Sequence, residues 1–385
     1  MIYLDYAATT PVRREVVETV REMLAEEYGN PSGVYATGRR AKTILTKARR
    51  DMADTLGVQA DTLYFTSGAT EGDNWAIRSQ AMTARAAGRG HHIVATAVEH
   101  PAVAETLAYL ETIGFTVTYL LPDADGMYSP DAFAAVSTKD TVGWIAMAVN
   151  NETGSRLPVA EIGIEARKRG IWFHVDAVQA VGHATWDFSQ VPCTSFVLSA
   201  HKLYGPKGIG CMVYRPWETD PLPLQPLLYG GGQERGLRSG TENVPYIAGM
   251  AQALREAYGE SRETMAGGAA LTTQLLRQLA AAGISAVRNG GKDTVPYIIS
   301  LWLPGISAVQ TVIQADLAGF AISAGSACSA GSVAPSRVIS TYHPTQPERA
   351  TESIRISPGR LTTAADIEAF GAWLVKWVPT GKEMP

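Results

Sequence analysis

Short apolar runs rich in β-branched and aromatic residues alternate with helical patterns between about residues 60 and 215. The runs are TLYFTSG, HHIVATAVEH, FTVTYLL, TVGWIAMAV, IWFHVDAV, TSFVLSAH and GIGCMVYR, and helical patterns begin at Thr70 and Pro101. Strands that alternate with helices predict an α/β fold, in which a mainly parallel sheet carries helices on both faces. Polar residues follow directly after several runs. Because ligands bind outside the carboxyl ends of strands in such sheets, we expect a binding site there.

The pattern changes after a helical segment over about 244–265, and Gly267 and Gly268 behind it are predicted to form a joint. The later elements are a strand at YIISLWL, a helix at SAVQTVIQADLAG, a strand at FAISAG, and a final helix from about Thr363 with a Thr363/Asp366 capping pattern. This mixture predicts a second, smaller α+β domain.

Length and composition agree with two domains. The chain has 385 residues and is 46% hydrophobic, which suffices for a substantial core and is long for one domain. We predict a large domain over residues 15–255, and a small domain formed by residues 1–14 and 256–385.

The charge and the cysteines exclude several classes of function. A net charge of -4 without a long Lys/Arg run argues against direct nucleic-acid binding. The start MIYLDYAATTPVRR does not resemble a signal peptide, and no apolar run reaches membrane-spanning length, so we expect a cytoplasmic protein without membrane contact. Three cysteines without a CxxC pair argue against disulfides and against a thiolate metal site, and we expect no metal.

The segment FTSGATEGDN, residues 65–74, turns from a strand end into a helix that starts near Ala69 and Thr70. Free backbone N–H groups and the helix dipole can bind an anion there, with the Thr70 hydroxyl as an extra donor. The alternative is an ordinary capped helix.

Two further strand ends carry charged residues. Asp176 ends the strand in FHVDAVQAVGH, and Lys202 ends the strand in SFVLSAHKLYGPKG. A lysine, an aspartate and an anion-binding helix start form the set that pyridoxal phosphate requires: a Schiff-base amine, a partner for the ring nitrogen and a phosphate site. Alone, a lysine such as Lys202 is most often a solvated surface charge.

The segment SAGSACSAGS, residues 323–332, places Cys328 among small residues. Small neighbours leave a thiol accessible, which favours a reactive cysteine. A plain turn that happens to contain a cysteine is the alternative.

These motifs together resemble one family. The matching segments are YLDYAATTP, GNPS, TSGATEGDN, VEHPAV, VNNETG, HVDAVQAVG, SAHKLYGPKG, GGGQERGLRSGTEN, GSACSAG and IRISPGR. They resemble the cysteine desulfurases of the NifS/IscS-like group, which are pyridoxal-phosphate enzymes of fold type I in the class V aminotransferase family. The resemblance implies a homodimer with the cofactor near the subunit interface.

The resemblance also assigns roles to single residues. It implies that Lys202 is the Schiff-base lysine, that Asp176 binds the pyridine nitrogen and that His100 stacks on the ring and moves protons. It further implies that Asn151 and Gln179 contact the ring oxygen, and that the phosphate is bound by Ala69, Thr70, Ser199 and His201. Thr241 is implied to bind the phosphate of the other subunit. Arg355 and Asn30 are implied to bind the substrate. Pro358, next to Ser357, departs from the family pattern and leaves Arg360 as an alternative to Arg355.

For Cys328, the resemblance implies the nucleophile that takes sulfur from L-cysteine, releases alanine and passes its persulfide to an acceptor protein for iron-sulfur cluster assembly or thiolation. Cys193 and Cys211 stand in or beside apolar runs and are predicted to be core thiols. Two alternatives stay open. One is a selenocysteine lyase or another class V lyase or transaminase, and the other is a non-catalytic sulfur-assembly platform.

Overall fold

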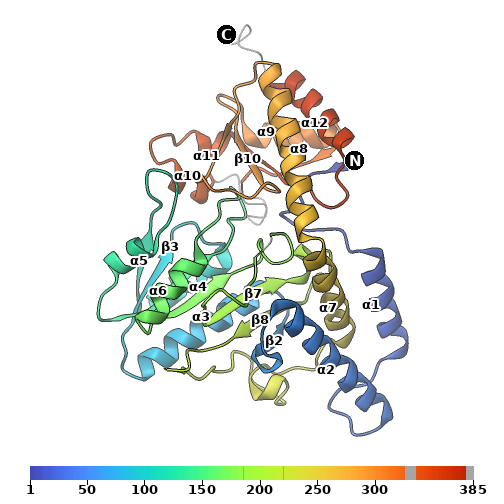
Figure 1. The fold of residues 1–385 in the computed structure, drawn as a ribbon, viewed down its shortest axis with the longest axis vertical. Helices are drawn as coiled ribbons and strands as arrows, with labels where there is room; N and C mark the ends of the chain where they lie inside the picture. The colour runs from blue at the N-terminus through green and yellow to red at the C-terminus, as the bar shows by residue number, and fades with distance from the viewer. Residues whose placement is uncertain (185, 220, 326–334, 379–385) are drawn as a thin grey trace.

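The computed structural model describes residues 1–184, 186–219, 221–325 and 335–378. Its largest element is a seven-stranded sheet (Figure 1). The strands, in spatial order, are β2 (Leu63–Thr66), β8 (Gly210–Tyr214), β7 (Ser195–Ser199), β6 (Trp172–Asp176), β5 (Thr141–Met147), β3 (His92–Thr96) and β4 (Thr116–Leu120). β8 runs opposite to the other six strands of this sheet. Each predicted apolar run contains one of these strands, and the α/β prediction is confirmed.

Helices cover both faces of this sheet because side chains alternate along each strand. Ile93 and Ile145 pack in a core with α3 (Ala69–Ala86) and α4 (Pro101–Thr112) on one face. Val94 and Trp144 point to the other face. The helices that pack there are α2 (Ala36–Leu56), α5 (Pro130–Val136), α6 (Val159–Lys168) and α7 (Val244–Gly259), and α1 (Arg14–Glu26) packs on α7.

A second, smaller α+β unit lies above this sheet in Figure 1. Its antiparallel sheet contains β12 (Ser353–Ile356), β10 (Ile299–Trp302) and β9 (Val287–Arg288), and the N-terminal β1 (Ile2–Tyr3) pairs in parallel with β11 (Phe320–Ala321). Its helices are α8 (Ser261–Ala281), α9 (Ala308–Leu317), α10 (Arg337–Tyr342), α11 (Arg349–Glu352) and α12 (Ala364–Trp377). Leu4 belongs to the core of this unit, so both ends of the described chain meet there.

Two local predictions have different outcomes. The capping box of Thr363 and Asp366 at the start of α12 is confirmed. The joint at Gly267 and Gly268 is wrong, because both glycines lie inside α8 and the helix breaks at Glu260 instead. A Cβ on Gly268 would lie 3.3 Å from the Pro296 carbonyl carbon, so this glycine permits close packing rather than a bend.

Among the described residues, no helix is long and apolar enough to span a membrane.

Candidate active site

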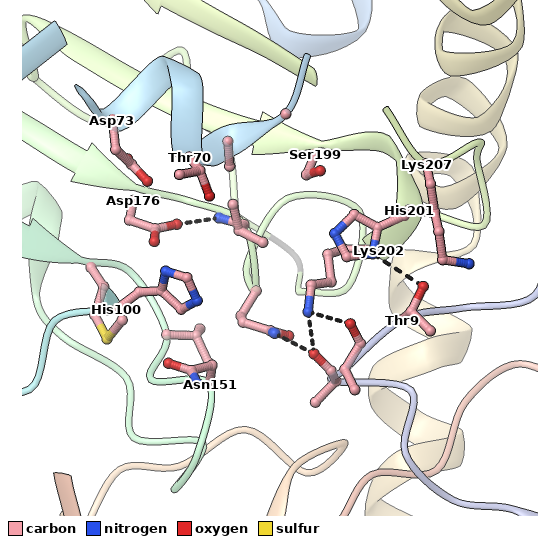
Figure 2. A pocket seen from close by; sticks show the side chains of 18 of the residues that line it. Thr9, Thr70, Asp73, His100, Asn151, Asp176, Ser199, His201, Lys202 and Lys207 are labelled. Carbon is pink, nitrogen blue, oxygen red and sulfur yellow. Dashed lines mark hydrogen bonds between the residues drawn. The ribbon is translucent and has the colours of Figure 1, made fainter. Parts of the chain in front are cut away.

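A cavity of about 410 Å³ opens at the edge of the large sheet where the parallel strands end. Residues at the ends of β2, β5, β6 and β7, or directly after them, line the cavity. The antiparallel β8 begins at this edge, and residues just before it line the cavity as well. The N-terminal segment and β12 of the smaller unit close the cavity from the other side through Ala7, Thr9 and Arg355. The expected position of the site at the carboxyl ends of the strands is therefore observed (Figure 2).

Lys202 supplies a buried amine to this cavity. It lies in the single turn of 3-10 helix that directly follows β7, and only 8% of the residue is exposed. Its Nζ donates to the Ala8 carbonyl oxygen at 2.8 Å and to the carbonyl oxygen of Ala7. Both acceptors are uncharged backbone groups, which fix the position of the amine at the cavity wall. This arrangement differs from the solvated surface lysine that was the alternative.

Asp176 stands at the last position of β6, facing the same cavity (Figure 2). Its Oδ1 accepts a hydrogen bond from the Val178 N–H at 3.0 Å. Burial raises the pKa of this carboxyl, while the nearby His100 and Lys202 lower it. A cationic group in the cavity would stabilise the carboxylate, and a protonated ring nitrogen is such a group.

Asp73 is a second buried carboxyl at the cavity, and the sequence analysis did not identify it. Its Oδ1 lies 3.0 Å from His174 Nε2, and its Oδ2 has no partner among the described residues. Burial raises the Asp73 pKa well above its ordinary value and lowers that of His174 to about 3, so the imidazole is neutral. Both residues stand in motifs that were singled out, Asp73 one turn after Ala69 and His174 two positions before Asp176. That spacing was the available signal.

The start of α3 forms the anion-binding end of the cavity. No side chain caps its N-terminus at Gly68, so the first N–H groups of the helix remain available to a ligand. Ala69, Thr70, Ser199 and His201 all line the cavity, as the phosphate prediction required. Lys207, which was not predicted, adds a positive charge on the same side (Figure 2).

Two imidazoles at the cavity have defined hydrogen bonds. His201 Nδ1 lies 3.1 Å from Thr9 Oγ1, and burial together with Lys202 and Lys207 lowers the His201 pKa to about 4. His100 is the N-cap of α4, where its Nδ1 accepts from the Ala102 N–H at 3.1 Å. Since Nδ1 is an acceptor, the neutral His100 ring carries its proton on Nε2.

Asn151 and Gln179 complete the predicted set on the cavity wall. Both line the cavity, as the ring-oxygen prediction required. Gln179 Nε2 donates to the Ala7 carbonyl at 2.9 Å, so this amide is held by the same segment that fixes Lys202. Asn151 contributes its backbone carbonyl as an acceptor for Arg355.

The predicted substrate residues separate in the structure. Arg355 lines the cavity, whereas Arg360 lines a different one and pairs with Glu260 at 3.1 Å. Asn30 is exposed, accepts a hydrogen bond from the Ser32 N–H at 2.9 Å and does not line the cavity of its own chain. The role of Asn30 in binding substrate stays a prediction.

Thr241 does not line the main cavity either. It is exposed in a small neighbouring cavity, which shares Ser67 and Gly208 with the main one. Its contact with the phosphate of the other subunit stays a prediction.

The three cysteines differ. Cys328 lies outside the described residues. Cys193 and Cys211 are both buried, and burial raises the pKa of each thiol. Their prediction as core thiols is confirmed.

These residues fit pyridoxal phosphate. The cavity combines a buried amine, a buried carboxyl near His100 and Lys202, and an uncapped helix start beside Lys207. An aldehyde, a protonated ring nitrogen and a phosphate are the complementary groups.

Comparison with known proteins agrees with this chemistry. The family model for class-V aminotransferases matches residues 2–370. The chain belongs to the class-V aminotransferase family. Within this family it is 38% identical over 367 residues to a protein of Methanosarcina thermophila named cysteine desulfurase IscS, covering 95% of this chain and 89% of the relative.

Two solved structures of similar proteins extend the comparison. A NifS-like protein matches with a TM-score of 0.89 and 32% identity, over 98% of both chains. A structure described as SspA in complex with cysteine matches with a TM-score of 0.79 and 32% identity, over 94% of this chain and 100% of the other. The prediction of a family member with the NifS-like fold is therefore confirmed.

Proposed function

We propose that this protein is a cysteine desulfurase, which removes sulfur from L-cysteine and releases L-alanine. The observation that carries the proposal is the meeting of Lys202, Asp176 and Arg355 in one cavity beside an uncapped helix start. The similarity to the cysteine desulfurase of Methanosarcina thermophila, over 95% of this chain, supports the same activity.

Pyridoxal 5'-phosphate is the proposed cofactor. Lys202 would hold it covalently, Asp176 would bind its ring nitrogen, and Asn151 and Gln179 would contact its ring oxygen. Its phosphate would lie at the start of α3, with Ala69, Thr70, Ser199 and His201 as its neighbours. When bound, the cofactor withdraws electrons from the substrate's α-carbon.

The side chains of this protein then bind the substrate and move its protons. Arg355 binds the α-carboxylate, a task that suits the planar guanidinium. His100 carries the exchangeable proton on Nε2, because Nδ1 is occupied by the Ala102 N–H. The buried Asp176 stays ionised once a positive ring nitrogen reaches it.

Cys328 is proposed as the sulfur acceptor within the enzyme. Its thiolate forms a bond to the sulfur of the substrate while the carbon–sulfur bond breaks. The carbon keeps the electron pair and takes up a proton, which gives the methyl group of alanine and leaves a persulfide on Cys328. An acceptor protein, for iron-sulfur cluster assembly or thiolation, would then remove the outer sulfur.

We further propose a cytoplasmic homodimer in which Thr241 contacts the phosphate bound by the other subunit. The exposed position of Thr241, in a cavity that adjoins the main one, supports this role. The large domain would comprise residues 15–255, and the small domain residues 1–14 and 256–385.

A substrate panel tests the proposed activity. Purified, cofactor-loaded protein is incubated with L-cysteine, with L-selenocysteine, and with L-alanine plus a 2-oxo acid. Alanine formation from L-cysteine, with sulfur left on the protein, is expected. Alanine from L-selenocysteine alone would indicate a selenocysteine lyase, amino-group transfer would indicate a transaminase, and the absence of all products would favour an assembly platform.

A further inference from the structure

Arg355 is already partly bound by the protein itself. The arginine lies on β12 with 2% of its side chain exposed, although it lines the active-site cavity. Its NH2 group donates to Asp5 Oδ1 at 2.8 Å, and its NH1 group donates to the Asn151 carbonyl oxygen at 2.8 Å. Its Nε has no partner among the described residues, although it is buried.

The donor count of the guanidinium leaves room for one carboxylate. A guanidinium has five N–H groups, and a bidentate carboxylate uses two of them. With two groups bound to Asp5 and Asn151, three remain, and one of them is the unpartnered Nε–H. A buried donor without a partner is costly, which favours a ligand at this position.

Asp5 is itself held on both oxygens. Its Oδ2 accepts from the Ser323 hydroxyl at 2.7 Å, while Oδ1 binds Arg355. Ser323 is tied to Arg355 as well, since the Arg355 N–H donates to the Ser323 carbonyl at 2.7 Å. The carboxylate therefore has one defined position, and its contact with NH2 fixes one side of the guanidinium.

We propose that Asp5 is a positioning residue for the substrate carboxylate, acting through Arg355. It fixes the guanidinium plane before the substrate arrives, so the arginine loses little rotational freedom on binding. Asn151 provides the second fixed point through its backbone carbonyl. The inference deepens the proposed function, on which it rests for the identity of the ligand.

The test measures binding rather than turnover. In the Cys328→Ser background, the dissociation constant of L-cysteine is read from the visible absorbance of the cofactor-loaded protein. Cysteamine, which lacks only the carboxylate, is the matched ligand. Asp5→Ala is expected to weaken L-cysteine binding about tenfold and to leave cysteamine binding within about twofold. Asp5→Asn keeps an acceptor oxygen in the same place and is expected to restore most of the loss.

Two controls separate positioning from general damage. In an Arg355→Ala background, adding Asp5→Ala is expected to change L-cysteine binding by less than about twofold, because the residue acts only through the arginine. Asp125→Ala removes an exposed ion pair with Lys292, 2.8 Å long, whose two residues do not line the cavity, and is expected to leave L-cysteine binding unchanged. Asp5→Glu keeps the charge but displaces the carboxylate, and is expected to weaken L-cysteine binding selectively even if Asp5→Ala does not fold.

Three results would overturn the inference. They are an unchanged L-cysteine constant in both Asp5→Ala and Asp5→Glu, an equal loss for cysteamine, and tighter L-cysteine binding, which would make Asp5 a competitor of the substrate. Failure of the proposed function is a separate observation, namely that the wild-type protein forms no alanine from L-cysteine.

Discussion

Glu99 provides a quantitative prediction because it is a buried carboxyl next to His100. Its Oε1 accepts from the Met147 N–H at 2.8 Å and from the Thr96 hydroxyl, and its Oε2 has no partner among the described residues. Burial raises the pKa of Glu99 from its ordinary value of 4.5 to about 7, although the Thr96 hydrogen bond lowers it. The folded protein therefore favours the protonated carboxyl.

The sign and the size of the pH effect follow. Because the pKa is higher in the folded state than in the unfolded state, the contribution to stability is complete below about pH 4.5 and is lost as the pH rises through about 7. Each pH unit in this range lowers the free energy of unfolding by about 1.4 kcal/mol. Glu99 alone should thus remove about 3 kcal/mol between the two values.

The substitution Glu99→Gln removes the titration and keeps an acceptor oxygen for Met147 and Thr96. The difference in the free energy of unfolding, variant minus wild type, should increase by about 2 to 3 kcal/mol as the pH rises from about 5 to about 8. Urea unfolding of both proteins, followed by tryptophan fluorescence at several pH values, measures this difference. Glu105→Gln, at an exposed position of α4, is the control. Parallel pH profiles for Glu99→Gln and wild type, or a gap that shrinks with rising pH, would refute the reasoning.

Three further predictions concern the cofactor. Lys202→Ala should lack the visible absorption band of a covalently held cofactor, and a band like that of the wild type would move the assignment elsewhere. Asp176→Asn should keep the fold but lose about a hundredfold or more in alanine formation, because a neutral amide cannot keep the ring nitrogen protonated; near-normal turnover would contradict the role. Thr241→Val should weaken cofactor affinity in a protein that light scattering shows to be a dimer, and an active wild-type monomer would exclude a cross-subunit contact.

Much of the fold was predictable from the sequence because the strands of the large sheet, apart from the edge strand β4, are buried on both faces. Such strands form continuous apolar runs, and Asp176 and Lys202 stand out at their ends. The antiparallel direction of β8 carried no such signal, since an apolar run has no direction. The break at Glu260 was missed because glycine pairs suggest flexibility, whereas Gly268 lies against Pro296.

The site was predictable only where local motifs describe it. Asp5 and Arg355 are 350 positions apart, and no local pattern reports their contact. Asp73 and His174 meet through the packing of α3 on β6, and no local sequence pattern reports this contact. The substrate role of Asn30 was predicted from the resemblance alone. In the structure, its side-chain oxygen accepts a hydrogen bond from the Ser32 N–H, two residues further on.

The most direct test of the central claim is a single incubation with L-cysteine, followed by two measurements. The amount of alanine is quantified, and the cysteine that carries the persulfide is identified by mass spectrometry of thiol-labelled peptides. We predict equal amounts of both in the first turnover, with the persulfide on Cys328 and none in Cys328→Ser, while Cys193→Ser behaves as the wild type. Alanine formation by Cys328→Ser at the wild-type rate, or a persulfide on Cys193 or Cys211, would contradict the account.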